Sequence, residues 1–247
     1  MSINHQPTIE ILADKESLIE RALAVVVAKL EAAIALRGQA TIALSGGSTP
    51  KPLYEALAKQ PLPWPQIQVF WGDERYVPSD HPDSNQRMTR HAWLDQIEMP
   101  PSNIHPMPTE AGDADRDAED YENELAKFFH LAAGEFPSFD LILLGLGDDA
   151  HTASLFPQTP ALKVRDRLIT VGNKDGQPRL TFTVSLINQA ACVIFLVAGA
   201  SKQPALAEIF APEADPFTYP ARLIQPQGEL IWLLDQAAGE NLPSKIN

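Results

Sequence analysis

One histidine of this chain follows an apolar run at a point where base chemistry is possible. The stretch LILLGLGDDAHTASLFP, residues 141–157, gives Asp148, Asp149 and, after one alanine, His151. A neighbouring carboxylate can orient an imidazole and hold it as a general base. The same residues could ligate a metal, but no HExxH or Cys/His spacing accompanies them. A serine nucleophile is not indicated, because the chain has no GxSxG elbow.

A glycine-rich turn is the clearest candidate for binding an anion. In LSGGSTP, residues 44–50, Gly46 and Gly47 allow the backbone to approach a ligand closely, and Ser48 or Thr49 offers a hydroxyl. A helix that starts behind the turn would add free N–H groups and a positive dipole end. The motif matches neither the Walker A loop nor GxGxxG. An ordinary strand-to-helix turn with a Ser/Thr cap is the alternative.

Cationic side chains accompany other polar turns. WGDERYVP, residues 71–78, places Asp73 and Arg75 on one side of an extended segment, facing a substrate or forming a surface salt bridge. In GASKQP, Lys202 falls at the start of a helix that Ser201 is expected to cap, where the dipole disfavours a cation unless an anion binds there. Arg179, which opens RLTFT, is a third candidate.

The cysteine and the other histidines are not expected to take part in catalysis. Cys192 is the only cysteine and lies in the apolar run AACVIFLVAG, which indicates a buried, inert thiol. The remaining five histidines lie in polar or loop sequence and are expected to be solvated: His5, His81, His91, His105 and His130.

The elements that must position these residues alternate between strands and helices. Apolar residues at helical spacing predict a helix over 14–37, with Asp14 as its N-cap and Gly38 at its end. Further helices are predicted over 50–59, with Pro50 in its first position, and over 83–94, 113–134 and 201–210. Strands are predicted over 40–45, 67–72, 139–147, 166–171, 179–184, 191–199 and 229–235.

These strands are mostly continuous apolar runs, typical of a parallel sheet covered on both faces. We therefore predict one α/β domain over residues 1–247, with a three-layer α/β/α core and a mostly parallel sheet. Ligands of such sheets bind beyond the carboxyl ends of the strands. The polar turns after four strands, SGGSTP, GDER, GDDAH and GASK, are expected to meet there.

Composition excludes several kinds of partner. The chain has 247 residues, 19 Lys and Arg against 32 Asp and Glu, and a formal net charge of −13, which disfavours a nucleic-acid binder. The first residues show no secretory signal, and no apolar run reaches the ~18 residues of a membrane span. We expect a cytoplasmic protein without nucleic-acid or membrane partners, a monomer or weak homo-oligomer.

Together the motifs LSGGSTP, WGDER…DSN, LGLGDDAHTASLFP and the SK after the 191–199 run resemble the glucosamine-6-phosphate isomerase/6-phosphogluconolactonase family, in particular its lactonase branch. The resemblance covers essentially the whole chain. It implies a Rossmann-like α/β sandwich and hydrolysis of 6-phospho-D-glucono-1,5-lactone, a step of the oxidative pentose phosphate pathway, without metal or organic cofactor.

The resemblance also implies roles for individual residues. His151 would activate water, oriented by Asp149 or Asp73, while Asp73 and Arg75 would lie beside the lactone. The sugar phosphate would bind on the glycine-rich turn with help from two cations, through Ser45, Gly46, Gly47, Ser48, Thr49, Arg179 and Lys202.

Two positions separate the chain from its relatives. The isomerase branch resembles GxDGHIAFNEP at this site and uses its glutamate in ring opening, whereas Phe156 stands there in this chain. Ala150 replaces the usual glycine between Asp and His, at a cost of roughly 1 kcal/mol if the position needs a positive φ. An amino-sugar phosphate isomerase/deaminase and a non-catalytic sugar-phosphate-binding protein are the alternatives.

Overall fold

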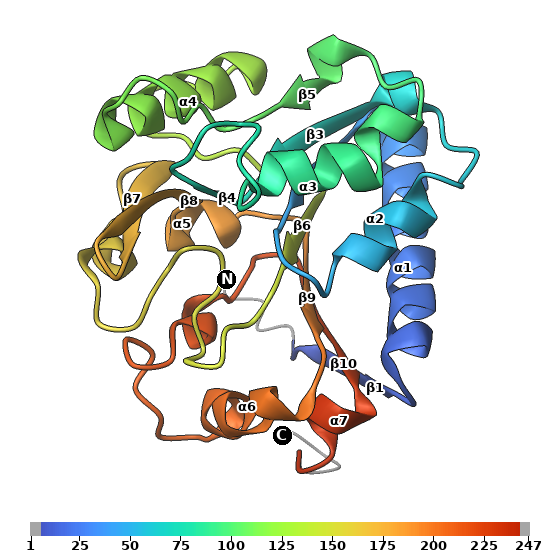
Figure 1. Ribbon diagram of the computed structural model, residues 1–247, viewed down its shortest axis with the longest axis vertical. Helices are drawn as coiled ribbons and strands as arrows, with labels where there is room; N and C mark the ends of the chain where they lie inside the picture. The colour runs from blue at the N-terminus through green and yellow to red at the C-terminus, as the bar shows by residue number, and fades with distance from the viewer. Residues whose placement is uncertain (1–5, 243–247) are drawn as a thin grey trace.

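A parallel sheet of seven strands runs through the computed structural model, which describes residues 6–242 (Figure 1). Its spatial order is β1-β10-β9-β6-β2-β3-β5, and each neighbouring pair is parallel. The strands are β1 (Thr8–Leu12), β2 (Ala40–Leu44), β3 (Ile67–Trp71), β5 (Ile104–His105), β6 (Leu141–Leu144), β9 (Cys192–Val197) and β10 (Glu229–Asp235). Because all run the same way, their carboxyl ends share one edge.

The central strands are buried on both faces, as their apolar sequences predict. Every residue of β2, β6 and β9 is buried. The short strand β1 was missing from the sequence prediction. It lies at the edge of the sheet and is only partly buried, so its five residues lack the continuous apolar run of the inner strands.

Helices cover both sides of this sheet. They are α1 (Lys15–Arg37), α2 (Lys51–Leu57), α3 (Asn85–Ala92), α4 (Ala114–Phe128), α5 (Val184–Ile187), α6 (Gln203–Phe210) and α7 (Gln236–Gly239). In Figure 1, α1 and α2 lie along one side, and α4 and α5 lie on the other. The three-layer arrangement predicted from the sequence is confirmed.

The helix ends follow local chemistry in most cases. The Asp14 side chain accepts the Ser17 N–H at 2.8 Å, and Gly38 ends α1 with a φ of 79°, as predicted. Pro50 is the N-cap residue of α2 rather than its first helical residue. The prediction that Ser201 caps α6 is wrong. A short 3₁₀ turn, Ala200–Lys202, precedes α6, and no side chain caps the helix.

A second, antiparallel sheet was not distinguished from the first in the sequence. It contains β4 (Asp73–Arg75), β8 (Gln177–Phe182) and β7 (Ile169–Lys174), in that order. Gly72 joins the two sheets, because its N–H donates to Leu44 O of the large sheet at 2.9 Å and its carbonyl accepts the Phe182 N–H of the small one at 2.8 Å.

Two further points concern membrane-spanning helices and the number of domains. No helix of residues 6–242 is long and apolar enough to cross a membrane. The single domain over 1–247 stays a prediction, and His5 lies outside the described residues.

Candidate active site

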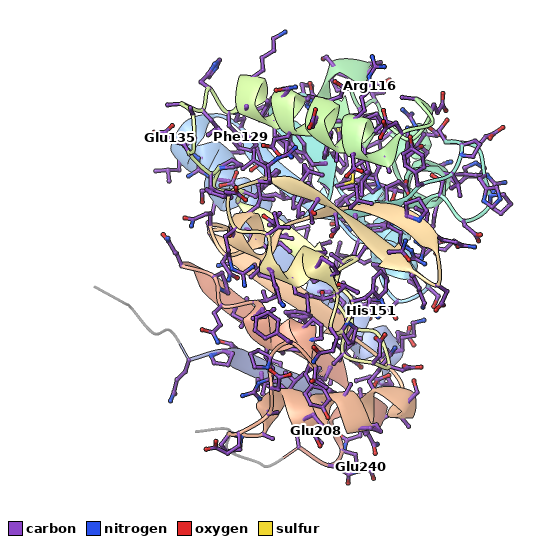
Figure 2. The ribbon with its side chains drawn as sticks, turned by 90° about the vertical axis from the view of Figure 1, so that its left-hand side faces the viewer. Arg116, Phe129, Glu135, His151, Glu208 and Glu240 are labelled. Carbon is purple, nitrogen blue, oxygen red and sulfur yellow. The ribbon has the colours of Figure 1, made fainter. Side chains whose placement is uncertain are left out.

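A cavity of about 180 Å³ opens beyond the carboxyl ends of β2, β3 and β6. Three of the four predicted turns contribute to its lining, together with the residues that flank the third turn, Asn85 of α3 and Arg179 of β8. The lining residues are Ser45, Gly46, Gly47, Asp73, Arg75, Asn85, Gly145, Leu146, Gly147, His151, Thr152, Ala153 and Arg179. Figure 2 shows His151 across the molecule from Phe129 and Glu135, which follow α4. The fourth turn, after β9, lies outside this lining.

His151 is paired with Asp149. The imidazole Nδ1 lies 2.5 Å from Asp149 Oδ1, and the His151 backbone N–H donates to the same oxygen at 3.1 Å. The hydrogen bond with His151 lowers the pKa of the Asp149 carboxyl to about 2. An ionised carboxylate only accepts hydrogen bonds, so Nδ1 donates to Asp149, and Nε2 is the ring nitrogen left to exchange a proton with a substrate or water.

The loop that carries this pair turns tightly. The Gly147 N–H donates to His151 O at 2.8 Å, and a Cβ on Gly147 would lie 2.0 Å from His151 Nδ1. Ala150 between them has a φ of 63° and is fully buried. The position therefore does adopt the left-handed conformation in which alanine costs roughly 1 kcal/mol relative to glycine.

Asp73 has a different partner. Its Oδ2 accepts the Ser154 hydroxyl at 2.7 Å in a buried contact. Of the two carboxylates considered from the sequence, Asp149 is therefore the one bound to His151. Asp73 lines the cavity and anchors the segment that follows the histidine.

Two guanidinium groups enter the cavity from the small sheet. Arg75 of β4 and Arg179 of β8 lie directly opposite each other in the antiparallel ladder. Arg75 donates to Asp83 O at 2.8 Å, while its buried Nε has no partner among the described residues. Burial, and then the charge of Arg75, lowers the pKa of Arg179. Like charges placed opposite each other are unfavourable unless an anion joins them.

Asn85, which lines the cavity, and Glu74, which holds the Asn85 backbone, were left unassigned from the sequence. The buried Glu74 carboxylate accepts the N–H groups of Arg75, Asn85 and Gln86, each at 2.8 Å. Burial raises the pKa of Glu74 despite these bonds. The hydrogen bond to Glu74 holds Asn85 in the cavity lining, and Asn85 Nδ2 donates to Asp73 O at 2.9 Å. The DSN motif was the available signal for Asn85.

The glycine-rich turn contributes through its first part. Ser45, Gly46 and Gly47 line the cavity, whereas Ser48 and Thr49 do not. A Cβ on Gly46 would lie 1.8 Å from Asn85 Oδ1, and Gly47 has a φ of 99°. Both positions therefore favour glycine, for lack of space at the first and for backbone conformation at the second.

Lys202 lies outside the residues that line the cavity. Its Nζ donates to Asp148 Oδ1 at 2.6 Å, and Ser201 Oγ donates to the same oxygen at 3.1 Å. The hydrogen bond from Lys202 lowers the pKa of Asp148. A carboxylate of this chain thus offsets the unfavourable position of Lys202 at a helix start, where the sequence analysis expected a bound anion.

Phe156 forms an apolar wall beside the base. Its buried ring lies 4.6 Å from the His151 ring, between centroids, and 5.5 Å from the guanidinium carbon of Arg179. Lys174, which the sequence analysis did not single out, places its Nζ 5.8 Å from the same ring.

The remaining reactive residues lie elsewhere. Cys192 is buried, and burial raises the pKa of its thiol to about 11. His105 was predicted to be solvated, and this is wrong. Its Nδ1 lies 2.8 Å from Glu124 Oε1, and its ring stacks on Phe70 at 4.3 Å. Within residues 6–242, no three His, Cys, Asp or Glu side chains cluster as a metal site would require.

The fold and the cavity place the chain among α/β enzymes that act at the carboxyl edge of a parallel sheet. The chain belongs to the family described as glucosamine-6-phosphate isomerases/6-phosphogluconolactonase, whose model matches residues 13–232. The resemblance seen in the sequence motifs is thereby confirmed.

Relatives of known name share nearly the full length. The chain is 74% identical over 236 residues to the 6-phosphogluconolactonase of Synechocystis sp., covering 96% of this chain and 98% of that one. It is 63% identical over 235 residues to the 6-phosphogluconolactonase of Nostoc sp., covering 95% and 98%. The solved structure of 6-phosphogluconolactonase from Trypanosoma brucei matches with a TM-score of 0.86 at 34% identity, covering 96% and 99%.

Proposed function

We propose that this chain hydrolyses 6-phospho-D-glucono-1,5-lactone to 6-phosphogluconate. The observation that carries the proposal is the Asp149–His151 pair, whose imidazole lines the same cavity as Arg75, Arg179 and the glycine-rich turn. A base beside an anion-binding surface suits an ester whose far end carries a phosphate. The names of the near full-length relatives support this substrate.

The phosphate would bind between the Ser45–Gly47 backbone and Arg179. Arg179 has no carboxylate within ion-pair distance among the described residues, and it presents a bidentate donor. Lys202 would act indirectly, by holding Asp148 and with it the loop that carries His151. Binding the remote phosphate would place C1 of the lactone near His151, so that binding energy serves the reacting centre.

His151 would act as the general base. Its Nε2 takes a proton from a water molecule while Asp149 holds the Nδ1 proton and stabilises the imidazolium that forms. The resulting hydroxide attacks C1, and negative charge grows on the carbonyl oxygen. Arg75, or an N–H of the glycine-rich turns, would stabilise that oxygen. The imidazolium then returns the proton to the ring oxygen as the C1–O bond breaks. No step calls for a metal or an organic cofactor.

Phe156 favours hydrolysis over the isomerase reaction of the same family. A ring-opening reaction needs an acid or base at this position, and the phenyl ring supplies neither. Its contact with His151 instead restricts the imidazole on its apolar side. We therefore expect no ammonia release from glucosamine 6-phosphate.

The test is lactone consumption by the purified protein. The lactone is generated in situ by oxidising glucose 6-phosphate, and the spontaneous rate is subtracted. His105→Gln is a matched control for His151→Gln, because His105 also pairs with a carboxylate but lies outside the cavity lining. We expect His151→Gln to lose about 10²–10⁴-fold in kcat and His105→Gln to retain it. Near-normal turnover by His151→Gln would exclude the proposed base.

A further inference from the structure

The pairing of β2 with β3 stops one residue before the cavity. The last register pair is Leu44 with Trp71, and the Gly72 N–H donates to Leu44 O at 2.9 Å. Ser45 is the next residue, and it is buried. Its backbone N–H and C=O thus need partners from outside the ladder, because leaving a buried polar group unpaired is unfavourable.

One phenol supplies both partners. The Tyr54 hydroxyl donates to Ser45 O at 2.7 Å and accepts the Ser45 N–H at 3.2 Å. Tyr54 belongs to α2, the helix that follows the turn, and is fully buried with its ring stacked on Trp93 at 6.1 Å. Burial raises the pKa of Tyr54, so the phenol keeps its proton. The turn is thereby tied to its own helix instead of to the neighbouring strand.

The turn that Tyr54 holds has little freedom to move. Gly46 is packed against Asn85 so closely that no Cβ fits between them. Ser45 Oγ is buried in the cavity lining and has no partner among the described residues. The Ser45 hydroxyl and the N–H groups of the two glycines are donors whose use for an anion depends on the position of the turn being fixed.

We infer that Tyr54 is a positioning residue that holds the Ser45–Gly47 turn in the geometry that binds the substrate's phosphate. Tyr54 does not line the cavity and acts only through the backbone of Ser45. The inference rests on the proposed function, because it assigns the turn to phosphate binding.

Tyr121 provides a matched control. It is also a fully buried tyrosine whose hydroxyl bridges two backbone groups, donating to His105 O at 2.9 Å and accepting the Trp71 N–H at 3.5 Å. Neither Tyr121 nor its partners line the cavity. Tyr54→Phe and Tyr121→Phe therefore remove similar bonds at different places.

We expect both variants to lower the melting temperature, and only Tyr54→Phe to raise KM for the lactone, by about tenfold with kcat within about twofold. The dissociation constant of 6-phosphogluconate, measured by calorimetry, should rise by the same factor. Equal KM values for Tyr54→Phe and wild type, or equal increases in both variants, would overturn the inference.

A second variant perturbs the same turn without touching the phenol. Gly47→Ala forces a side chain onto a residue with a φ of 99°, and we expect it to raise KM as well; an unchanged KM would refute the role of the turn. Failure of the proposed function is separable, because the wild type would then not hydrolyse the lactone. Calorimetry with inorganic phosphate still tests Tyr54 in that case, since Tyr54→Phe alone should weaken phosphate binding.

Discussion

Two of the loops that line the cavity are held in opposite ways. The glycine-rich turn takes its unusual backbone from glycine and is fixed by the neutral Tyr54 hydroxyl. The loop over residues 147–158 has alanine or glutamine in left-handed conformations, with φ of 63° at Ala150, 48° at Ala153 and 58° at Gln158. Ion pairs and long-range hydrogen bonds hold this second loop.

Its contacts reach distant parts of the chain. Asp148 pairs with Lys202, the Ala150 carbonyl accepts the Ala221 N–H at 3.1 Å, and the Gln158 side chain donates to Thr218 Oγ1 at 2.9 Å. Residues in sparsely populated backbone conformations persist only where the surroundings determine them, and they gather at functional sites. The loop that carries His151 therefore depends on tertiary contacts and on charge, whereas the glycine-rich turn depends more on glycine backbone geometry and on one neutral hydroxyl.

The largest expected effect is on the charged loop. Asp149→Asn leaves His151 without a carboxylate to hold Nδ1–H, so we expect kcat to fall about 10²-fold or more while KM stays within about twofold. Steady-state kinetics on the lactone measure both. A rise in KM with unchanged kcat would mean that Asp149 contacts the substrate and does not orient the base.

The next prediction distinguishes Arg179 from Lys202, which the sequence resemblance assigned together to the phosphate. Arg179→Gln removes a charged donor from the cavity, and we expect KM to rise about tenfold to a hundredfold. Lys202→Gln removes only the partner of Asp148, so we expect KM to change less than threefold and kcat to fall modestly. The reverse ranking in the same kinetic assay would place Lys202, and not Arg179, on the phosphate.

Exchanging glycine for alanine at residue 47, and alanine for glycine at residue 150, should change the free energy of unfolding by different amounts in the two loops. Gly47→Ala should lose about 1 kcal/mol of unfolding free energy, because it adds strain and open space surrounds its Cβ. Ala150→Gly should stay within about 0.5 kcal/mol of wild type, because strain relief is offset by lost methyl burial and added chain entropy. Urea denaturation measures both, and a large loss for Ala150→Gly would show that its methyl group outweighs its strain.

The smallest expected effect is a pH dependence. The folded pKa of Asp149 lies near 2, below its usual 3.8, so its contribution to stability is present above about pH 4 and is lost as pH falls through 2. The stability difference between wild type and Asp149→Asn should shrink over that window. The difference between wild type and Tyr54→Phe should not, because the phenol does not titrate there. A constant difference for both variants would contradict the contrast between the loops.

Much of this molecule could be predicted from local sequence. Continuous apolar runs gave the central strands, and the polar turns after β2, β3 and β6 do meet in one cavity. Asp14 and Gly38 cap α1 as their types predict. These features depend on periodicity and on chemistry within a few residues.

The features that were missed depend on contacts between distant segments. The sequence did not show that Asp148, 54 residues away in the chain, is the partner of Lys202. The apolar pattern of residues 169–182 predicts extended chain but not that β7 and β8 form a separate sheet with β4. The roles of Glu74 and Tyr54 were hidden for the same reason, since each acts through backbone groups that a sequence does not place.

Gly72 helps to set the spacing of the site. Its N–H is bonded to β2 of the large sheet and its carbonyl to β8 of the small one. Arg75 and Arg179 both belong to the small sheet, whereas His151 follows a strand of the large one. Ser154, three residues after His151, donates its hydroxyl to Asp73 and its N–H to Thr181 of the small sheet. The two sheets are therefore bonded to each other on both sides of the cavity, so the backbone sets the span between the base and the two guanidinium groups.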